Sequence, residues 1–266
     1  MKLSNIYIYP LKSSKAIKMD FSEVLTTGLA NDRTMAAIGE SNKVITGREF
    51  PALTSITATV SGNTLKLAKH GRKQLEIALP IGEKANFSFK LFRNTVEGIK
   101  CDDAASEWLS DVLGINCSLA YIDSNFRQID TKRGGKIDDR FAYADASPIH
   151  LITEESLGVL NSIMKKNVSE LNFRPNLVVK GGKAFDEDSW KSIVINDCVF
   201  EVHYKCERCI FTTVNPATFL KDEEMQPLAT LAKFRRNRKE PLTFGVYLVP
   251  RKTGSISIGD DVQVKK

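Results

Sequence analysis

The sequence predicts a mainly β protein with peripheral helices, an α+β fold, and three observations support this prediction. The N-terminal third consists of short β-prone runs separated by turn residues, without a helical period. Only three stretches, all later in the chain, carry apolar residues at helical spacing. The rest of the C-terminal half alternates strand-like runs with turns. At 266 residues the chain can bury a sizeable core as one large domain or two ordinary ones.

The N-terminal part favours a small β-barrel or sandwich, because many short strands with turn signals between them are typical of these folds. Turns are indicated by Gly28, by Asn31-Asp32 and by Ser61-Gly62-Asn63. The strands expected here cover residues 6–9, 24–27, 35–38, 56–60, 64–67, 75–78 and 87–92.

The pattern changes after residue 97, where a helix begins with Asp102 or Asp103 as its N-cap and ends at Gly114. We place a domain boundary here, which gives an N-terminal domain of residues 1–97 and a C-terminal domain of residues 98–266. A long exposed loop is expected over residues 123–140, and loops of that length are usually functional or disordered.

The second domain is predicted to be β-rich with helices at its edge. Thr153 is the expected N-cap of one helix, and another helix covers residues 228–236. The strands expected in this domain cover residues 117–122, 176–179, 193–195, 199–204, 211–214, 244–249 and 262–264.

The formal net charge of +6 is compatible with an anionic partner, from a phosphate to nucleic acid. The one basic cluster, within residues 233–239, is more often a solvated surface than a binding patch. No apolar run reaches the ~18 residues needed to span a bilayer, and the N-terminus is too short and polar for a signal sequence. We therefore expect a cytoplasmic protein without a membrane or nucleic-acid partner.

Five cysteines are thinly spread, so each is judged individually as a core residue, metal ligand or nucleophile. Cys206 and Cys209 are separated by Glu207 and Arg208, and the cation favours a thiolate, the form that binds metals. One Cys-x-x-Cys pair alone is weak support for structural zinc, and no βαβ context supports a thioredoxin-type dithiol. Two buried core cysteines are the remaining alternative.

Three short segments combine a cation with a small polar residue beside a strand end, as phosphate recognition requires. They cover residues 9–15, 31–33 and 173–176. Each of them alone is more often a surface turn.

The order of motifs along the whole chain resembles that of MOSC-domain proteins, in particular the YcbX-type proteins and the amidoxime-reducing components. The motifs are Tyr9-Pro-Leu-Lys-Ser, Gly28-Leu-Ala-Asn-Asp-Arg33, Thr46-Gly-Arg-Glu-Phe-Pro51, Asp145-Ala-Ser-Pro148, Asn172-Phe-Arg-Pro-Asn176, Glu187-Asp-Ser-Trp190, Cys206-Glu-Arg-Cys209 with Thr212-Thr-Val-Asn-Pro216, Phe244-Gly-Val-Tyr247 and Ile258-Gly-Asp260. The resemblance implies an N-terminal MOSC β-barrel domain followed by the MOSC domain, itself a β-barrel.

The same resemblance implies an enzyme with a molybdenum cofactor, in which Cys209 is the metal ligand and the catalytic residue. At Glu207 the family usually has Ser or Thr, and a carboxylate there would repel a phosphate unless its side chain turns away. Arg48 is expected either to line the substrate opening or to form a structural salt bridge. The cofactor-binding positions implied are Lys12, Ser13, Arg33, Ser147, Arg174, Asn176, Arg208 and Tyr247.

The activity implied is reduction of small N-hydroxylated compounds, such as N-hydroxylated bases, amidoximes and hydroxylamines, which would serve detoxification. No flavin, haem or ferredoxin motif is present, so electrons are expected from a separate flavoprotein reductase or ferredoxin. Pyridoxal phosphate is not an expected cofactor. The alternative is a non-catalytic protein that carries the molybdenum cofactor or its sulfur, because it would need the same pocket and thiolate.

Overall fold

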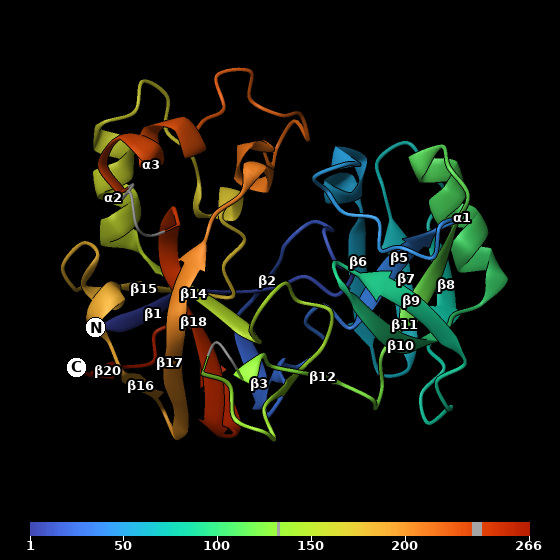
Figure 1. Ribbon diagram of the computed structural model, residues 1–266, viewed down its shortest axis with the longest axis horizontal. Coiled ribbons are helices and arrows are strands. Elements are labelled where there is room, and N and C mark those ends of the chain that lie inside the picture. Colours follow the sequence, from blue (N-terminus) through green and yellow to red (C-terminus); the bar gives the residue numbers. More distant parts are fainter. Residues whose placement is uncertain (132–133, 236–240) are drawn as a thin grey trace.

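The computed structural model describes residues 1–131, 134–235 and 241–266, which fold into two lobes lying side by side (Figure 1). One lobe contains both chain termini, helices α2 and α3, and the largest sheet. The other contains helix α1 and the strands from β5 to β11. This arrangement confirms the mainly β prediction with peripheral helices.

The lobe with the termini is built on an eight-stranded sheet of order β2-β1-β15-β14-β18-β17-β16-β20. Its neighbours are antiparallel except for β14 and β15, which are parallel. The strands are β1 (Lys2–Ile8), β2 (Ile17–Met19), β14 (Ile149–Thr153), β15 (Leu177–Lys180), β16 (Ser192–Ile195), β17 (Cys198–Glu207), β18 (Thr243–Lys252) and β20 (Val262–Lys265).

Smaller elements complete this lobe. A three-stranded sheet joins β3 (Phe21–Leu25) to β4 (Gly28–Leu29) and β19 (Gly254–Ser257), and β12 (Arg127–Gln128) pairs with β13 (Arg140–Phe141). The helices here are α2 (Glu154–Ser162) and α3 (Leu228–Arg235), with 3₁₀ turns η3 (Glu170–Asn172), η4 (Asp186–Ser189) and η5 (Ile210–Thr213).

The second lobe packs two small antiparallel sheets and one helix around an apolar core that includes Leu53, Leu65, Leu109 and Leu119. One sheet has the order β5-β11-β10-β9 and the other β6-β7-β8. Its elements are β5 (Met35–Gly39), η1 (Pro51–Ser55), β6 (Thr57–Ser61), β7 (Thr64–Ala68), β8 (Leu75–Ala78), β9 (Phe87–Leu91), β10 (Asn94–Lys100), α1 (Asp103–Leu113) and β11 (Cys117–Tyr121).

The hydrogen-bonded sheets join strands from both sides of the predicted boundary between residues 97 and 98. Strand β1 pairs with β15 in the lobe of the termini, and β11 pairs with β5 in the other lobe. The predicted domains, residues 1–97 and 98–266, therefore do not coincide with the two lobes, and this division of the sequence stays a prediction. The two halves of the sequence share each lobe, so loops from both can meet where the lobes touch.

Helix α1 forms as its end signals predict. The Asp102 carboxylate accepts a hydrogen bond from the Ala104 amide at 2.8 Å, and Gly114 ends the helix in the left-handed conformation. Thr153 likewise caps α2, where its hydroxyl accepts from the Ser156 amide. Helix α3 is described to Arg235, and the part of the basic cluster beyond it lies outside the described residues.

The strand predicted over residues 211–214 is wrong, because this segment is the 3₁₀ turn η5. The Thr212 hydroxyl donates to the Cys209 carbonyl at 3.0 Å, and the Thr213 hydroxyl donates to the Ile210 carbonyl at 2.8 Å. Threonine side chains that bond to nearby carbonyls offer the backbone an alternative to a sheet ladder. These local bonds outweigh the β propensity of the Phe-Thr-Thr-Val run.

The predicted loop at residues 123–140 is more ordered than expected where it is described. It contains β12 and leads into β13, and Arg251 binds the Asp139 carboxylate through two nitrogens. Arg251 also donates to Glu201 at 2.6 Å, so this ion-pair network fastens the loop to β17 and β18. Residues 132 and 133 of this loop lie outside the described residues.

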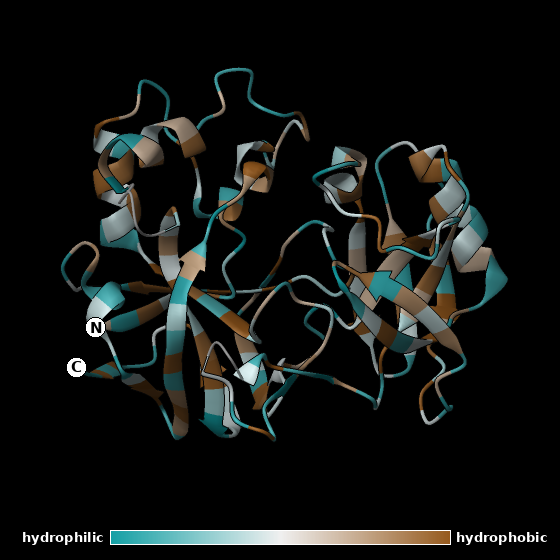
Figure 2. Cartoon of the chain, in the orientation of Figure 1, coloured by the Kyte–Doolittle hydropathy of each residue, from teal (hydrophilic) through white to brown (hydrophobic). Residues whose placement is uncertain are grey.

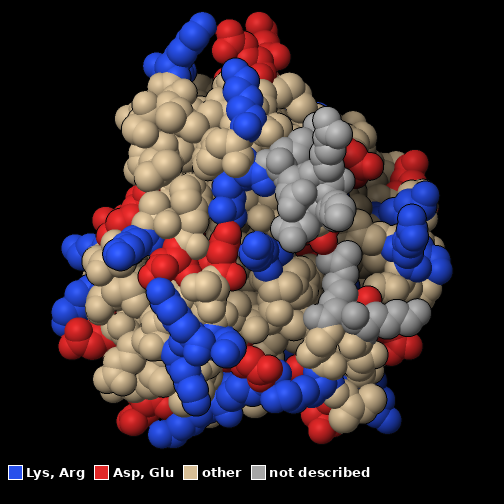
Figure 3. Space-filling model, turned by 60° about the vertical axis from the view of Figure 1, so that its left-hand side comes forward, with Lys and Arg blue, Asp and Glu red and all other residues tan. Residues whose placement is uncertain are grey.

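Apolar residues concentrate along the strands, while many connecting loops are hydrophilic (Figure 2). On the face in Figure 3, basic side chains are interspersed with acidic ones. Across the described ranges, no helix combines the length and hydrophobicity needed to cross a membrane.

Gly245 on β18 provides a test of the close approach between β18 and its neighbouring strand β14. It has φ +73°, and a Cβ atom built there would lie 2.4 Å from the Leu151 carbonyl oxygen. Gly259 has φ +94° but no atom within 4 Å of such a Cβ, so it serves as the matched control. We expect Gly259→Ala to cost about 1–2 kcal/mol of backbone strain and Gly245→Ala roughly 1–3 kcal/mol more, measured by urea unfolding. Equal losses would contradict the packing.

Candidate functional site

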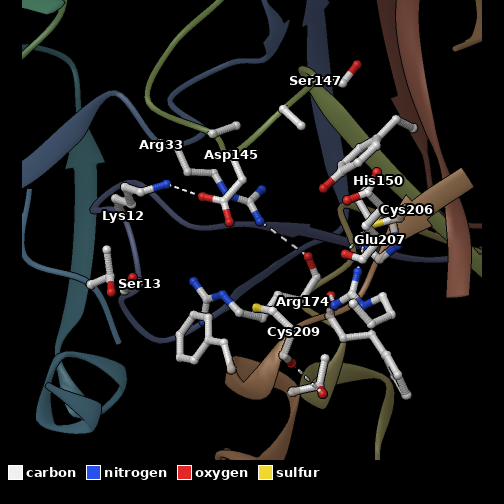
Figure 4. A pocket seen from close by; sticks show the side chains of 18 of the residues that line it. Lys12, Ser13, Arg33, Asp145, Ser147, His150, Arg174, Cys206, Glu207 and Cys209 are labelled. Atoms are coloured by element: carbon white, nitrogen blue, oxygen red, sulfur yellow. Dashed lines mark hydrogen bonds and ion pairs between the residues drawn. The ribbon is translucent and has the colours of Figure 1, made fainter. Parts of the chain in front are cut away.

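A cavity of ≈ 440 Å³ lies where the two lobes meet, and all nine residues predicted as cofactor or metal ligands line it. The catalytic candidate is Cys209, and the others are Lys12, Ser13, Arg33, Ser147, Arg174, Asn176, Arg208 and Tyr247. The second lobe contributes Arg48 and Phe92 to the wall. Figure 4 shows Lys12 and Ser13 on one side and Cys206 and His150 on the other, with Arg33 and Asp145 between them.

The cavity is built mainly by chain segments that adjoin strands of the large sheet. Lys12 and Ser13 follow β1, Ser147 precedes β14, and Arg174 precedes β15. Arg208 and Cys209 follow β17 directly. The strand pairing therefore brings together side chains as far apart in sequence as Lys12 and Tyr247.

Three of the nine predicted ligand residues have a left-handed backbone, which non-glycine residues seldom adopt. Ser13 has φ +70°, Arg33 has φ +50° and Arg174 has φ +53°. Such conformations cost of order 1 kcal/mol or more and persist only where the surroundings impose them. Their concentration around one cavity indicates that the loops are shaped to aim these side chains inward.

Asp145 links the two lobes at the mouth of the cavity. Its carboxylate accepts hydrogen bonds from the Lys12 ammonium and, at 3.0 Å, from the Arg48 guanidinium. Burial opposes ionisation of Asp145, but these two cations outweigh it and lower its pKa well below the usual range. Arg48 therefore forms the salt bridge that was one of its two expected roles, and it lines the cavity as well.

Arg33 and Arg174 lie against the buried ring of Tyr9, with guanidinium carbons 4.2 and 4.1 Å from its centroid. Arg33 donates to Asp32 at 2.6 Å and to the Asn176 side-chain oxygen at 2.9 Å. Burial raises the pKa of Tyr9 to about 12, so the ring stays neutral and its π face remains available to the cations.

Arg208 is held by two contacts at the opposite wall. It donates to the Cys206 sulfur at 2.6 Å and to the Phe173 carbonyl at 2.8 Å. Burial raises the pKa of Cys206 above its usual value, although Arg208 and Tyr247 oppose this effect. Burial also raises the pKa of Tyr247, so both groups stay protonated at neutral pH.

His150 lies within the sheet beneath this wall and is buried. Its Nε2 atom is 3.3 Å from the Phe244 carbonyl oxygen. Burial and the nearby Arg208 lower the pKa of His150 well below its usual value. The imidazole is therefore neutral at physiological pH and forms part of the wall without adding a charge.

Three buried polar atoms in the cavity wall have no hydrogen-bond partner among the described residues. They are the Ser147 hydroxyl, one terminal nitrogen of Arg174 and the Nε atom of Arg208. Buried polar groups are normally hydrogen-bonded, so unpaired ones at a cavity point to a ligand that completes them. Two of the three belong to cations, and the ligand that suits them carries anionic or strongly accepting oxygens.

Cys209 immediately follows the end of β17 and has an extended backbone as the residue before η5. Its side chain is partly exposed, whereas Cys206 is 1% exposed, so the pair is not simply a buried core element. Over the described ranges, no three His, Cys, Asp or Glu side chains are grouped to hold a metal ion. A metal bound at Cys209 must therefore take most of its ligands from a cofactor.

Asp145, His150 and Cys206 also line the cavity, although none of them was predicted as a ligand or catalytic residue. Asp145 and Cys206 belong to motifs that this chain shares with MOSC-domain proteins. A motif match shows that a segment is shared but not which of its side chains points inward. Glu207 lies at the cavity with an exposed side chain, which leaves it access to solvent.

Two family models match this chain. The model described as the MOSC domain matches residues 138–263, and the model described as the MOSC N-terminal beta barrel domain matches residues 1–116. The chain belongs to the MOSC-domain family. The MOSC domain is a molybdenum cofactor-binding domain, and the unpaired donors and the accessible Cys209 thiol fit such a group.

Curated relatives match nearly the full chain. It is 34% identical to mitochondrial amidoxime reducing component 2 of Rattus norvegicus over 286 residues, covering 98% of this chain and 82% of the relative. It is 33% identical to mitochondrial amidoxime-reducing component 1 of Homo sapiens over 282 residues, with the same shares. The component 1 of Danio rerio is 32% identical over 273 residues, covering 98% and 83%.

The charge on Asp145 predicts a pH-dependent contribution to stability. Because its folded-state pKa lies below the unfolded value near 4, the ionised carboxylate stabilises the fold at neutral pH, and this contribution is lost as the pH falls below about 4. We expect Asp145→Asn to cost about 1 kcal/mol at pH 7, because the buried Lys12 loses its partner although the Asp145 side chain is 43% exposed to screening solvent, and less at pH 3. Thermal unfolding at both values measures this.

The control for this prediction is Asp261→Asn. Asp261 is paired with Lys2 at 3.1 Å, but both side chains are at least half exposed. Exposed pairs contribute little, so this variant should unfold like the wild type at both pH values. A loss for Asp145→Asn that is the same at pH 3 and pH 7 would contradict the role of its charge.

Proposed function

We propose that this protein is a molybdenum cofactor-dependent reductase of N-hydroxylated compounds, acting on amidoximes, hydroxylamines and N-hydroxylated bases. The observation that carries the proposal is the cavity itself. Nine residues chosen from sequence motifs line it, and it offers a cysteine thiol together with unpaired donors on two arginines. The similarity to proteins named amidoxime-reducing components supports this reaction class.

In this proposal Cys209 is the protein ligand to the metal, and the basic side chains hold the anionic part of the cofactor. Arg174 and Arg208 have free nitrogens for phosphate oxygens, and the Ser147 hydroxyl can bond a polar edge of the pterin. Lys12, Ser13, Arg33, Asn176 and Tyr247 complete the proposed binding set. The bound cofactor supplies the two-electron chemistry that the side chains lack.

The overall reaction defines what the protein residues must do. An amidoxime takes up two electrons and two protons and leaves as an amidine plus water. The depressed pKa of Asp145 keeps it ionised, so it serves as a hydrogen-bond acceptor and not as the acid. The neutral His150 and the protonated Tyr247 add no charge of their own to the wall beside the Arg208 cation.

The electrons are proposed to come from a separate flavoprotein reductase or ferredoxin. A cytoplasmic location and a role in detoxification stay proposals, and the relatives carry the word mitochondrial in their names.

We expect wild-type protein from cells that make the cofactor to contain near-stoichiometric molybdenum and to reduce benzamidoxime with a viologen donor. Cys209→Ala should lose at least 100-fold of this activity, on the order of the loss when a positioned catalytic group is removed. The measurements are elemental analysis and amidine formation. Cys117→Ala, at a buried cysteine of the other lobe, is the control and should keep both properties.

The outcomes separate the two candidate functions. Molybdenum without turnover of any N-hydroxylated substrate would favour the carrier. Protein that holds zinc and no molybdenum under these conditions would overturn both.

A further inference from the structure

A second groove of ≈ 640 Å³ adjoins the first cavity on the surface of the α1-containing lobe. The two spaces share Thr46, Arg48 and Phe92 as lining residues, so they are continuous at this wall. Nothing in the proposed cofactor set reaches the second groove. A compound bound with one end near Cys209 could therefore extend past Arg48 and Phe92 into it.

Phe92 presents an aromatic ring at this junction. It occupies the turn between β9 and β10, is 48% exposed and has φ +56°, a backbone conformation that a bulky residue seldom adopts. The Lys12 ammonium and the Arg48 guanidinium lie 5.4 and 5.2 Å from the ring centroid. An exposed aromatic ring held by cations beside a cavity is suited to stack on a flat ligand.

Arg48 connects this ring to the reactive end of the cavity. Its guanidinium donates to the Asp145 carboxylate at 3.0 Å, and Arg48 lines the first cavity together with Cys209. Arg48 therefore belongs to the same cavity wall as the proposed metal ligand and also contacts the Phe92 ring. The bond to Asp145 fixes one of its nitrogens and leaves other N–H groups to donate to a ligand oxygen.

The floor of the second groove is apolar, and away from Arg48 its rim carries equal numbers of acids and lysines. Val44, Ile45 and Leu91 form buried parts of the floor, with the half-buried Phe50 and Ile115 beside them. The rim carries two acids and two lysines, and three of these four side chains form hydrogen bonds with neighbouring polar side chains. The rim residues are Glu40, Lys43, Glu49 and Lys90. This composition suits an uncharged apolar group better than an anion.

We propose that the second groove is the subsite for the aromatic or apolar body of the substrate. In this arrangement Phe92 stacks on a flat ring next to the N-hydroxyl group, and Arg48 donates to the oxygen of that group. The second groove then takes any further apolar extension. The inference rests on the proposed function for the reaction, but the class of ligand follows from the groove alone.

The first test compares benzamidoxime with 4-phenylbenzamidoxime, which carries a second ring. We expect kcat/KM to be about tenfold higher for the longer compound in the wild type, because a pocket gains at least this factor from a well-placed apolar group. Ser41→Trp places a large ring at the groove, since Ser41 lines it. The ratio should fall to about one in this variant.

Ser61→Trp is the matched control, because Ser61 is also an exposed serine of this lobe, at the end of β6, but does not line the groove. It should keep the wild-type ratio. Phe92→Ala should raise the KM for benzamidoxime roughly three- to tenfold, with a smaller effect on acetamidoxime, which has no ring. A wild type without preference for the longer substrate, or the same ratio in Ser41→Trp, would overturn the proposal.

A binding measurement separates this inference from the reductase function. 4-Phenylbenzamide has the same body but no N–O bond, so its binding can be followed by calorimetry whether or not the protein turns over any substrate. Binding to the wild type and Ser61→Trp that weakens at least tenfold in Ser41→Trp would support the subsite even if benzamidoxime were not reduced. No binding, or equal binding to all three proteins, would overturn it.

Discussion

The convergence of five basic side chains in one cavity is the constraint on which the site depends. Lys12, Arg33, Arg48, Arg174 and Arg208 all line it, and like charges at this density repel unless they are compensated. Asp32 binds Arg33, and Asp145 binds Lys12 and Arg48, but the carboxylates facing the cavity are fewer than the cations. The remaining positive charge, together with the unpaired nitrogens of Arg174 and Arg208, makes the fold complementary to an anionic ligand.

The basic side chains of the cavity are positioned by two features, the left-handed backbone of their loops and the pairing of the strands that flank these loops. Ser13, Arg33 and Arg174 adopt left-handed conformations at the ends of loops whose strands are fixed in or beside the large sheet. The Tyr9 ring supports two of the three guanidinium groups that a phosphate would meet. Cofactor sites need this rigidity, because a loosely held cation loses conformational entropy each time it binds.

The sequence was most informative where local chemistry decides the structure. The Asp102 and Thr153 caps, the strand pattern and the motif-derived ligands could all be predicted, because each depends on a few neighbouring residues. The predicted strand at residues 211–214 failed because two threonine hydroxyls bond to carbonyls three residues back. Asp145 was missed because its role depends on Lys12 and Arg48, which lie about 100 residues or more away. No local sequence pattern predicts the contact of Asp145 with these two distant residues.

The two lobes contribute different residues to the cavity wall. The lobe with the large sheet supplies Cys209 and most of the cations, whereas the other lobe supplies Arg48 and Phe92 at the mouth. Changes in the second lobe can therefore alter which ligands enter without disturbing the groups that would hold a cofactor. Asp145 joins the two parts, because its carboxylate binds Lys12 of the proposed cofactor set and Arg48 of the proposed substrate subsite.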